Sequence, residues 1–235
     1  MRGLTVFCPV YNEEALIEGN LARLVDFLEK SGIGPFEVII GENGSTDQSP
    51  RILEALCRKD DRISWFHLDE KEVGTAFSEG VRRARYERFV TVDMDLSIDL
   101  DFINRAVSLL ETHDIVIGSK IMGNQKRPWL RKSVSNLFII LARFLLGIGF
   151  HDYSIAAKAY RTASARRYLD FLDKKTFYVV IMVHLATADG LKITEIPVSC
   201  FDMRESRFNL LHEGVYKFGN LFLLFLRSVV LRKRG

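Results

Sequence analysis

Two carboxylates, Asp93 and Asp95, follow a short apolar stretch that contains Val90 and Val92. Alternating β-branched residues of this kind predict a buried strand. The carboxyl ends of strands in an α/β sheet face the crevice where ligands usually bind. Two neighbouring carboxylates repel each other unless a cation neutralises them, and their oxygen atoms suit Mg²⁺ or Mn²⁺. The pair therefore predicts a divalent metal site, although Asp residues are also common in simple turns at strand ends.

The segments around this pair alternate between strand and helix patterns. Short apolar runs predict strands at residues 4–8, 36–41, 63–68, 89–93 and 114–118. The spacing of apolar residues predicts helices at residues 13–31, 48–59, 73–85 and 99–111, with Asp47 and Asp99 as N-caps. This alternation is typical of right-handed βαβ units, so we expect an α/β fold with a mostly parallel sheet flanked by helices.

Composition limits the class of protein. A chain of 235 residues with 48% hydrophobic side chains can bury one large core, so we expect one α/β domain with attached segments. Its three cysteines contain no CxxC pair, and its five histidines contain no HxxxH pair. These counts argue against a disulfide framework and against a zinc enzyme.

The net charge of +3 conceals two unlike halves. Residues 1–118 carry 13 Lys and Arg against 22 Asp and Glu, whereas residues 119–235 carry 20 against 8. We expect the acidic half to hold a cation and the basic half to face phosphates or an anionic surface. Nucleic acid is not the expected partner, because the basic residues lie beside long apolar runs and not within a base-stacking pattern.

Two later segments, residues 137–150 and 221–226, are strongly apolar and have basic flanks; Trp129 precedes the first. Both are shorter than the about 20 apolar residues that a membrane-spanning helix needs. Cations and a Trp beside an apolar helix are typical of a helix that lies in the membrane interface. The alternative is a pair of buried core helices or the interface of a homodimer.

Two further polar loops are predicted at the same edge of the sheet as the Asp pair. The sequence PVYNEE at 9–14 ends the first strand, and GENGSTD at 41–47 ends the second. Gly44 permits a tight turn, and the Ser45 hydroxyl can bond to backbone or ligand. Because the carboxyl ends of parallel strands meet at one edge, we expect all three loops to line one crevice.

Together, the three loops resemble the inverting family 2 glycosyltransferases of GT-A (Rossmann-like) fold. In that family a P-[AV]-Y-N-E-E loop and a D-D-G-S-T-D loop hold the nucleotide of a sugar donor, and a D-x-D motif holds a metal on its diphosphate. The resemblance implies that Asp93 and Asp95 bind Mg²⁺ or Mn²⁺. It implies a nucleotide-sugar site made of Pro9, Tyr11, Asn12, Glu13, Glu42, Asn43, Gly44, Ser45, Asp93 and Met94.

More narrowly, the chain is similar to dolichol-phosphate mannose synthases, which are polyprenyl-phosphate glycosyltransferases. The matching motifs are DMDL at 93–96, GSK at 118–120, residues 152–161 ending in KAYR, EIPV at 195–198 and RESR at 204–207. The resemblance implies transfer from a donor such as GDP-mannose or UDP-glucose to dolichyl or another polyprenyl phosphate. It implies catalytic roles for Asp95, Lys120, Arg131 and Arg204, and an acceptor-phosphate site of Lys120, Arg131, Ser135, Arg204 and Arg207.

The same resemblance predicts how the chain is organised. We expect a GT-A domain over residues 1–208, which includes an interface helix at about 130–150. Residues 209–235 are expected to form an amphipathic, membrane-associated helix. The protein would then lie on the cytoplasmic face of the cell membrane as a peripheral protein.

Three positions depart from the family's pattern. Glu42 and Asn43 stand where the family usually has two Asp, which leaves the choice of base open. Ser97 stands where mannose synthases often have Gln beside the metal. Lys120 replaces the usual Arg, so the charge is kept but the planar fork that binds phosphate bidentately is lost.

The late apolar segment 177–188 contains no acidic residue, whereas many relatives carry one there. A phosphate acceptor does not need such a base, because its second pKa of about 6 leaves it largely anionic at neutral pH. We therefore expect a lipid phosphate acceptor positioned by cations. The alternatives are a family 2 transferase acting on a soluble or glycan hydroxyl, a phosphatase similar to haloacid dehalogenases, and a non-catalytic nucleotide-binding membrane module.

Overall fold

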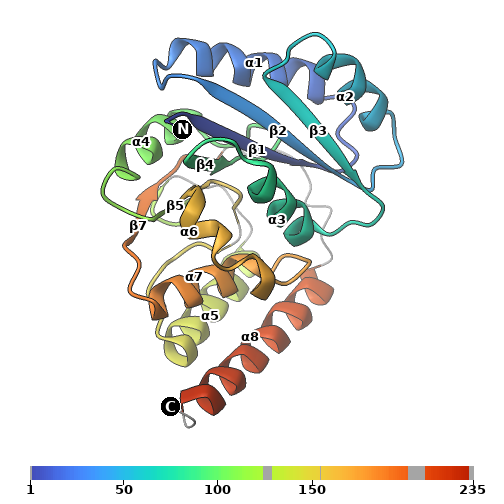
Figure 1. Ribbon diagram of the computed structural model, residues 1–235. Helices are drawn as coiled ribbons and strands as arrows, with labels where there is room; N and C mark the ends of the chain where they lie inside the picture. The colour runs from blue at the N-terminus through green and yellow to red at the C-terminus, as the bar shows by residue number, and fades with distance from the viewer. Residues whose placement is uncertain (1, 124–128, 154, 201–209, 233–235) are drawn as a thin grey trace.

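The computed structural model describes residues 2–123, 129–153, 155–200 and 210–232, with side chains in the two longest helices described over 134–146 and 214–228. In these residues seven strands form one sheet in the order β3-β2-β1-β4-β6-β5-β7 (Figure 1). They are β1 (Leu4–Val10), β2 (Phe36–Asn43), β3 (Ile63–Leu68), β4 (Arg88–Thr91), β5 (Ile115–Ser119), β6 (Lys158–Arg161) and β7 (Ile193–Pro197). The five strands expected from apolar runs are confirmed, and so is the mostly parallel sheet: β6 alone of these strands is antiparallel to its neighbours.

Helices cover both faces of the sheet, as expected for a βαβ chain. One face packs against α1 (Ile17–Lys30), α2 (Ser49–Cys57) and α4 (Asp101–Leu109). The other packs against α3 (Val73–Arg83), α5 (Trp129–Leu146), α6 (Thr162–Arg166), α7 (Tyr178–Ala188) and α8 (Leu210–Arg232), with a short 3₁₀ turn, η1, at Leu169–Phe171. Side chains of β1 point alternately to the two faces of the sheet. Val6 and Cys8 therefore pack with the helices of the first face, and Phe7 packs with those of the second.

Both helices with a predicted N-cap begin one residue later than that cap implies, at Ser49 and Asp101, so Asp47 and Asp99 each lie two residues before the first helical residue. Asp47 accepts the backbone N–H of Ser49 at 2.9 Å, and Asp99 accepts that of Asp101 at 3.0 Å. Each carboxylate therefore satisfies the first backbone donor of α2 or α4, which has no partner within its own helix.

A helix is present where one was expected at about residues 130–150, and it ends before residue 150. The helix α5 begins at Trp129 and ends at Leu146. Gly147 follows with φ +70°, in the left-handed region that glycine adopts most easily, and this conformation ends the helix.

The expected C-terminal helix corresponds to α8, which packs against α5 (Figure 1). The rings of Phe138 and Phe218 meet edge to face with centroids 5.5 Å apart, and Leu221 is buried. The domain boundary at residue 208 stays a prediction. Within the described residues, the structure contains no helix that combines the length and the apolar character required to cross a bilayer.

Candidate functional site

The strand β4 delivers Asp93 and Asp95 to the same sheet edge as the ends of β1 and β2. The N–H of Val92 donates to the Phe7 carbonyl at 3.0 Å, so the chain leaving β4 stays beside β1. It then turns: Leu96 has φ +47°, and its N–H donates to the Asp93 carbonyl at 3.0 Å. Both carboxylates remain half-buried at this turn.

The neighbours of the Asp pair fix the turn from two sides. The Asp95 carboxylate accepts the Ser97 N–H at 3.0 Å. Met94 is buried, and its carbonyl accepts the Asn20 side chain of α1 at 3.0 Å. Met94 therefore contributes to this site through its backbone and packing.

The donor set of this turn fits a hard divalent cation. Two carboxylates that protrude from one strand end can supply two oxygen ligands, and Mg²⁺ commonly takes its other ligands from substrate phosphates and water. Among the described residues, no group of three or more His, Cys, Asp and Glu side chains is arranged to hold a metal. An ion bound here would therefore need ligands besides these two side chains.

The Asp93 carboxylate affects buried groups around it. Burial, and then this carboxylate, raise the pKa of the Cys8 thiol and of the Tyr178 hydroxyl. Lys158 of β6 is also fully buried, and its ammonium donates to the Ile155 carbonyl. Burial lowers the pKa of Lys158 to about 8, against the opposing effect of Asp152 and Asp93. Lys158 is therefore a buried lysine whose charge interacts with that of Asp93, and the sequence motifs assigned it no role.

The first two loops interlock. Asn12 has φ +54°, and its N–H donates to the Ser45 hydroxyl at 2.9 Å. Its side-chain oxygen accepts the Thr46 N–H at 2.8 Å, and the Glu14 N–H donates to Asp47 at 3.1 Å. In addition, the Glu13 N–H donates to the Ser49 hydroxyl at 3.1 Å. The conformations of the two loops therefore depend on each other.

The residues that replace the family's Asp pair are engaged within the protein. Glu42 is fully buried; one of its oxygens accepts the Ser45 N–H at 2.5 Å and the other contacts the His67 ring. The Asn43 side-chain oxygen accepts the Glu72 N–H at 2.7 Å. Gly44 has φ +76°, as the expected tight turn requires. Glu42 and Asn43 therefore hold the shape of the loop, and His67 is a member of this site that the sequence analysis missed.

The side chains of the first loop remain accessible. Pro9 precedes Val10, the last residue of β1, and is half-buried, as is Tyr11. The Lys71 ammonium lies 3.7 Å from the centroid of the Tyr11 ring, a cation–π distance. The aromatic ring of the first loop therefore lies next to a cation from the segment between β3 and α3, and Lys71 is not part of any of the sequence motifs.

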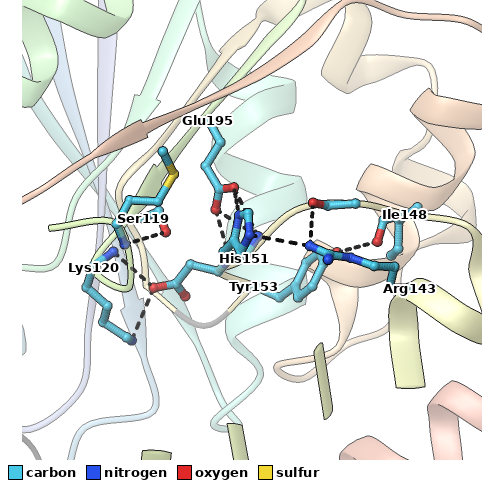
Figure 2. A network of polar contacts seen from close by, with 10 residues as sticks. Ser119, Lys120, Arg143, Ile148, His151, Tyr153 and Glu195 are labelled. Carbon is cyan, nitrogen blue, oxygen red and sulfur yellow. Dashed lines mark hydrogen bonds and ion pairs between the residues drawn. The ribbon is translucent and has the colours of Figure 1, made fainter. Parts of the chain in front are cut away.

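Among the predicted acceptor residues, Lys120 is the one whose side-chain contacts the structure gives in detail. It follows β5, is only 3% exposed, and its ammonium lies 3.7 Å from the Asp152 carboxylate (Figure 2). Ser135 lies half-buried on α5. Arg131 belongs to α5, but its side chain lies outside the described residues, as do Arg204 and Arg207 entirely. That these cations meet at one acceptor-phosphate site stays a prediction.

The sequence model described as "Glycosyl transferase family 2" matches residues 5–169, a span that contains all three loops and the Asp pair. The chain belongs to glycosyl transferase family 2. Family membership confirms the resemblance that the three loops carry.

Several curated glycosyltransferases match most of the chain. Glycosyltransferase AglD of Haloferax volcanii is 29% identical over 217 residues, which are 89% of this chain and 35% of that protein. An undecaprenyl-phosphate 4-deoxy-4-formamido-L-arabinose transferase of Serratia proteamaculans is 26% identical over 84% of this chain and 60% of its own length. An undecaprenyl-phosphate mannosyltransferase of Micrococcus luteus is 27% identical over 85% of this chain and 83% of its own. The chain thus spans only part of the first two relatives.

Solved structures confirm the GT-A type of fold. The glucosyl-3-phosphoglycerate synthase of Mycobacterium tuberculosis, crystallised with Mn²⁺ and UDP-glucose, superimposes with a TM-score of 0.70 over 95% of this chain and 79% of its own. The two sequences are 16% identical, so this likeness concerns the fold alone.

Proposed function

We propose that this family 2 protein transfers a sugar, with inversion, from a nucleotide-sugar donor to a polyprenyl phosphate in a metal-dependent reaction. The observation that supports it most is the pair of half-buried carboxylates, Asp93 and Asp95, beside two interlocked loops at one sheet edge. The names of the relatives add support, because two of them act on undecaprenyl phosphate.

In this proposal the two interlocked loops receive the nucleotide, and its diphosphate points toward Asp93 and Asp95. Those two residues would hold Mg²⁺ or Mn²⁺, which when bound stabilises the negative charge that develops on the leaving diphosphate. Tyr11 offers a ring face to the base, with Lys71 next to it. Donors of the GDP-mannose or UDP-glucose type both satisfy this chemistry.

The acceptor half of the proposal rests on the composition of α7. This helix carries no Asp or Glu, and its His184 ring is bonded to the Ser228 hydroxyl of α8 at 3.0 Å. A phosphate acceptor is already anionic, so its oxygen can attack the anomeric carbon as the bond from that carbon to the diphosphate breaks. Lys120, Arg131, Ser135, Arg204 and Arg207 are the proposed residues that position this phosphate.

A donor panel tests the proposed function. Purified protein with Mn²⁺ is mixed with undecaprenyl phosphate in detergent micelles and with GDP-mannose, UDP-glucose or other nucleotide sugars in turn. We expect one donor to yield a lipid-linked sugar together with free nucleoside diphosphate, and soluble sugars to remain unmodified. Transfer to a soluble sugar would support the hydroxyl-acceptor alternative. Nucleotide-sugar binding without turnover on any acceptor would support a non-catalytic module.

An apolar face on α5 and α8 supports membrane association. Its exposed members are Leu137, Ile140 and Phe144 on α5 and Val215, Phe222, Leu223 and Leu226 on α8. The two helices lie together at the end of the molecule away from α1 and α2 (Figure 1). Arg143 and Arg227 are exposed on the same two helices. We propose that this apolar face lies in the interface of an anionic membrane on the cytoplasmic side, with the basic residues at the headgroups.

Replacing Ile140 and Phe144 together by Ser should weaken binding to phosphatidylglycerol vesicles by at least about tenfold. Each fully buried apolar side chain contributes about 1.5–3 kcal/mol, and Phe144 is 84% exposed in the free protein. Vesicle sedimentation measures the effect, and added salt should weaken binding of the unaltered chain.

The matched control is Phe171→Ser, which removes an exposed Phe outside α5 and α8 and should leave vesicle binding unchanged. If the unaltered protein ignores vesicles and forms a dimer that the double substitution dissociates, the apolar face is a dimer interface and the membrane proposal is wrong.

A further inference from the structure

Glu195 of β7 binds a two-residue turn in the segment between α5 and β6 (Figure 2). Its carboxylate accepts the His151 N–H at 2.9 Å and the Asp152 N–H at 3.0 Å. It also lies 2.8 Å from Nδ1 of the His151 ring. The Glu195 side chain is only 8% exposed, so these contacts are made largely out of water. One buried carboxylate therefore fixes the backbone at residues 151 and 152.

That turn carries the partner of Lys120. The Asp152 side chain is 1% exposed, and Oδ2 accepts the Lys120 N–H at 3.3 Å and lies 3.7 Å from the Lys120 ammonium. Its other oxygen accepts the Ile155 N–H at 3.3 Å. Asp152 thus holds both the backbone and the charged end of Lys120. A buried ion pair of this kind is costly to disturb, because either partner alone would be left uncompensated.

A third set of contacts ties the same turn to α5. Arg143 donates to the Gly149 carbonyl at 3.1 Å and lies 3.3 Å from Nε2 of His151. The Tyr153 hydroxyl donates to the Ile148 carbonyl at 3.3 Å. The segment that presents Asp152 is therefore held from β7 and from α5 at once.

We infer that Glu195 and Asp152 are positioning residues for acceptor transfer: Glu195 fixes the turn, the turn aims Asp152, and Asp152 sets Lys120 at the end of β5. This inference rests on the proposed function, in which Lys120 serves the acceptor. Glu195 and Asp152 contact other residues of the protein, so we expect each to affect the transfer rate indirectly, through Lys120.

The Glu195→Gln variant tests the first step. Its amide group keeps one acceptor oxygen but presents N–H donors where backbone N–H groups and the His151 ring need an acceptor, so the turn should loosen. With undecaprenyl phosphate and the donor that the unaltered protein uses, we expect acceptor kcat/KM to fall about tenfold or more while donor KM changes by less than about twofold. Glu195→Asp, which keeps an acceptor-only group, should recover part of the loss. The control Glu54→Gln alters an exposed Glu on α2 and should change neither constant.

A double-variant cycle tests the second step. Because Glu195 is inferred to act through Asp152, the Glu195→Gln/Asp152→Asn double variant should be no slower than Asp152→Asn alone. If Asp152→Asn fails to fold, Lys120→Gln replaces it, and the effect of Glu195→Gln should likewise vanish in that background. Additive losses would overturn the inference, and so would equal losses in the donor and acceptor constants, which a merely structural role produces.

Identifying the acceptor that the unaltered protein uses shows whether a failure concerns this inference or the proposed function. If that acceptor is a soluble sugar, the proposed function fails, and the same ratios measured with the sugar still decide whether Glu195 positions Lys120. If no acceptor is used at all, both proposals are overturned.

Discussion

Replacing Asp95 by Asn should lower metal-dependent transfer at least about a hundredfold, a typical effect of removing one group that stabilises transition-state charge. The amide is neutral, so the site keeps one carboxylate instead of two at the end of β4. Because Asp95 is half-buried at the edge of the sheet and not in the core, its substitution should leave the fold intact. The measurement is kcat across a Mn²⁺ titration, together with calorimetry of Mn²⁺ and nucleoside diphosphate binding.

The matched control is Asp26→Asn, which removes an exposed carboxylate that pairs with Lys30 on α1. It should change neither the rate nor the Mn²⁺ dependence. Thermal melting shows whether both variants remain folded. A rate for Asp95→Asn close to that of the unaltered protein in Mn²⁺ would exclude Asp95 as a metal ligand.

A polyprenol without its phosphate should be inert, because α7 offers no carboxylate to remove a proton from a hydroxyl acceptor. In the proposed reaction, the nucleophile is the anionic phosphate of the acceptor. The acidic limb of the rate–pH profile should then follow the second ionisation of the phosphate, at a pKa of about 6. The comparison of polyprenol with polyprenyl phosphate, and the profile from about pH 5 to 8, are the two measurements.

The cations proposed for the acceptor extend this prediction. Arg131→Ala and Arg204→Ala should each cost about 1.5–3 kcal/mol, or about ten- to a hundredfold in acceptor use, through the loss of one charge-assisted contact. Metal-dependent nucleotide affinity should change little. Arg58→Ala, which alters an exposed Arg directly after α2, is the control. Efficient glycosylation of the free alcohol, or of a soluble sugar, would contradict the lipid-phosphate assignment.

Much of the fold follows from local sequence signals. The runs that became β1, β2, β4 and β5 are largely apolar on both faces, which is typical of central strands, and the helices between them carry one apolar stripe each. The strand β6 escaped prediction because it has only four residues, Lys158 to Arg161, and begins with a lysine. A charged residue at a fully buried position breaks the pattern by which a strand is recognised.

The polar site was harder to predict than the sheet. Motif spacing places Asn12, Ser45 and Asp93 at one edge, because strand order and direction decide that placement. It does not tell which oxygens are already engaged: Glu42 meets His67, a residue 25 positions away, and Lys120 meets Asp152, 32 positions away. Such pairings depend on the tertiary fold, so the sequence alone does not show which group lies beside Glu42 or Lys120.

The place of β6 between β4 and β5 bears on the order in which the chain can fold. The first four strands lie in the order β3-β2-β1-β4, so every pairing among them is available once residue 91 has been synthesised. The next strand, β5, pairs with β6 and β7, both of which lie later in the chain. It must wait for residues 158–161 before it can join the sheet, and closing that longer loop slows folding. On the ribosome, the edge that carries Asn12, Ser45 and Asp93 can therefore assemble while the partners of Lys120 are still to be made.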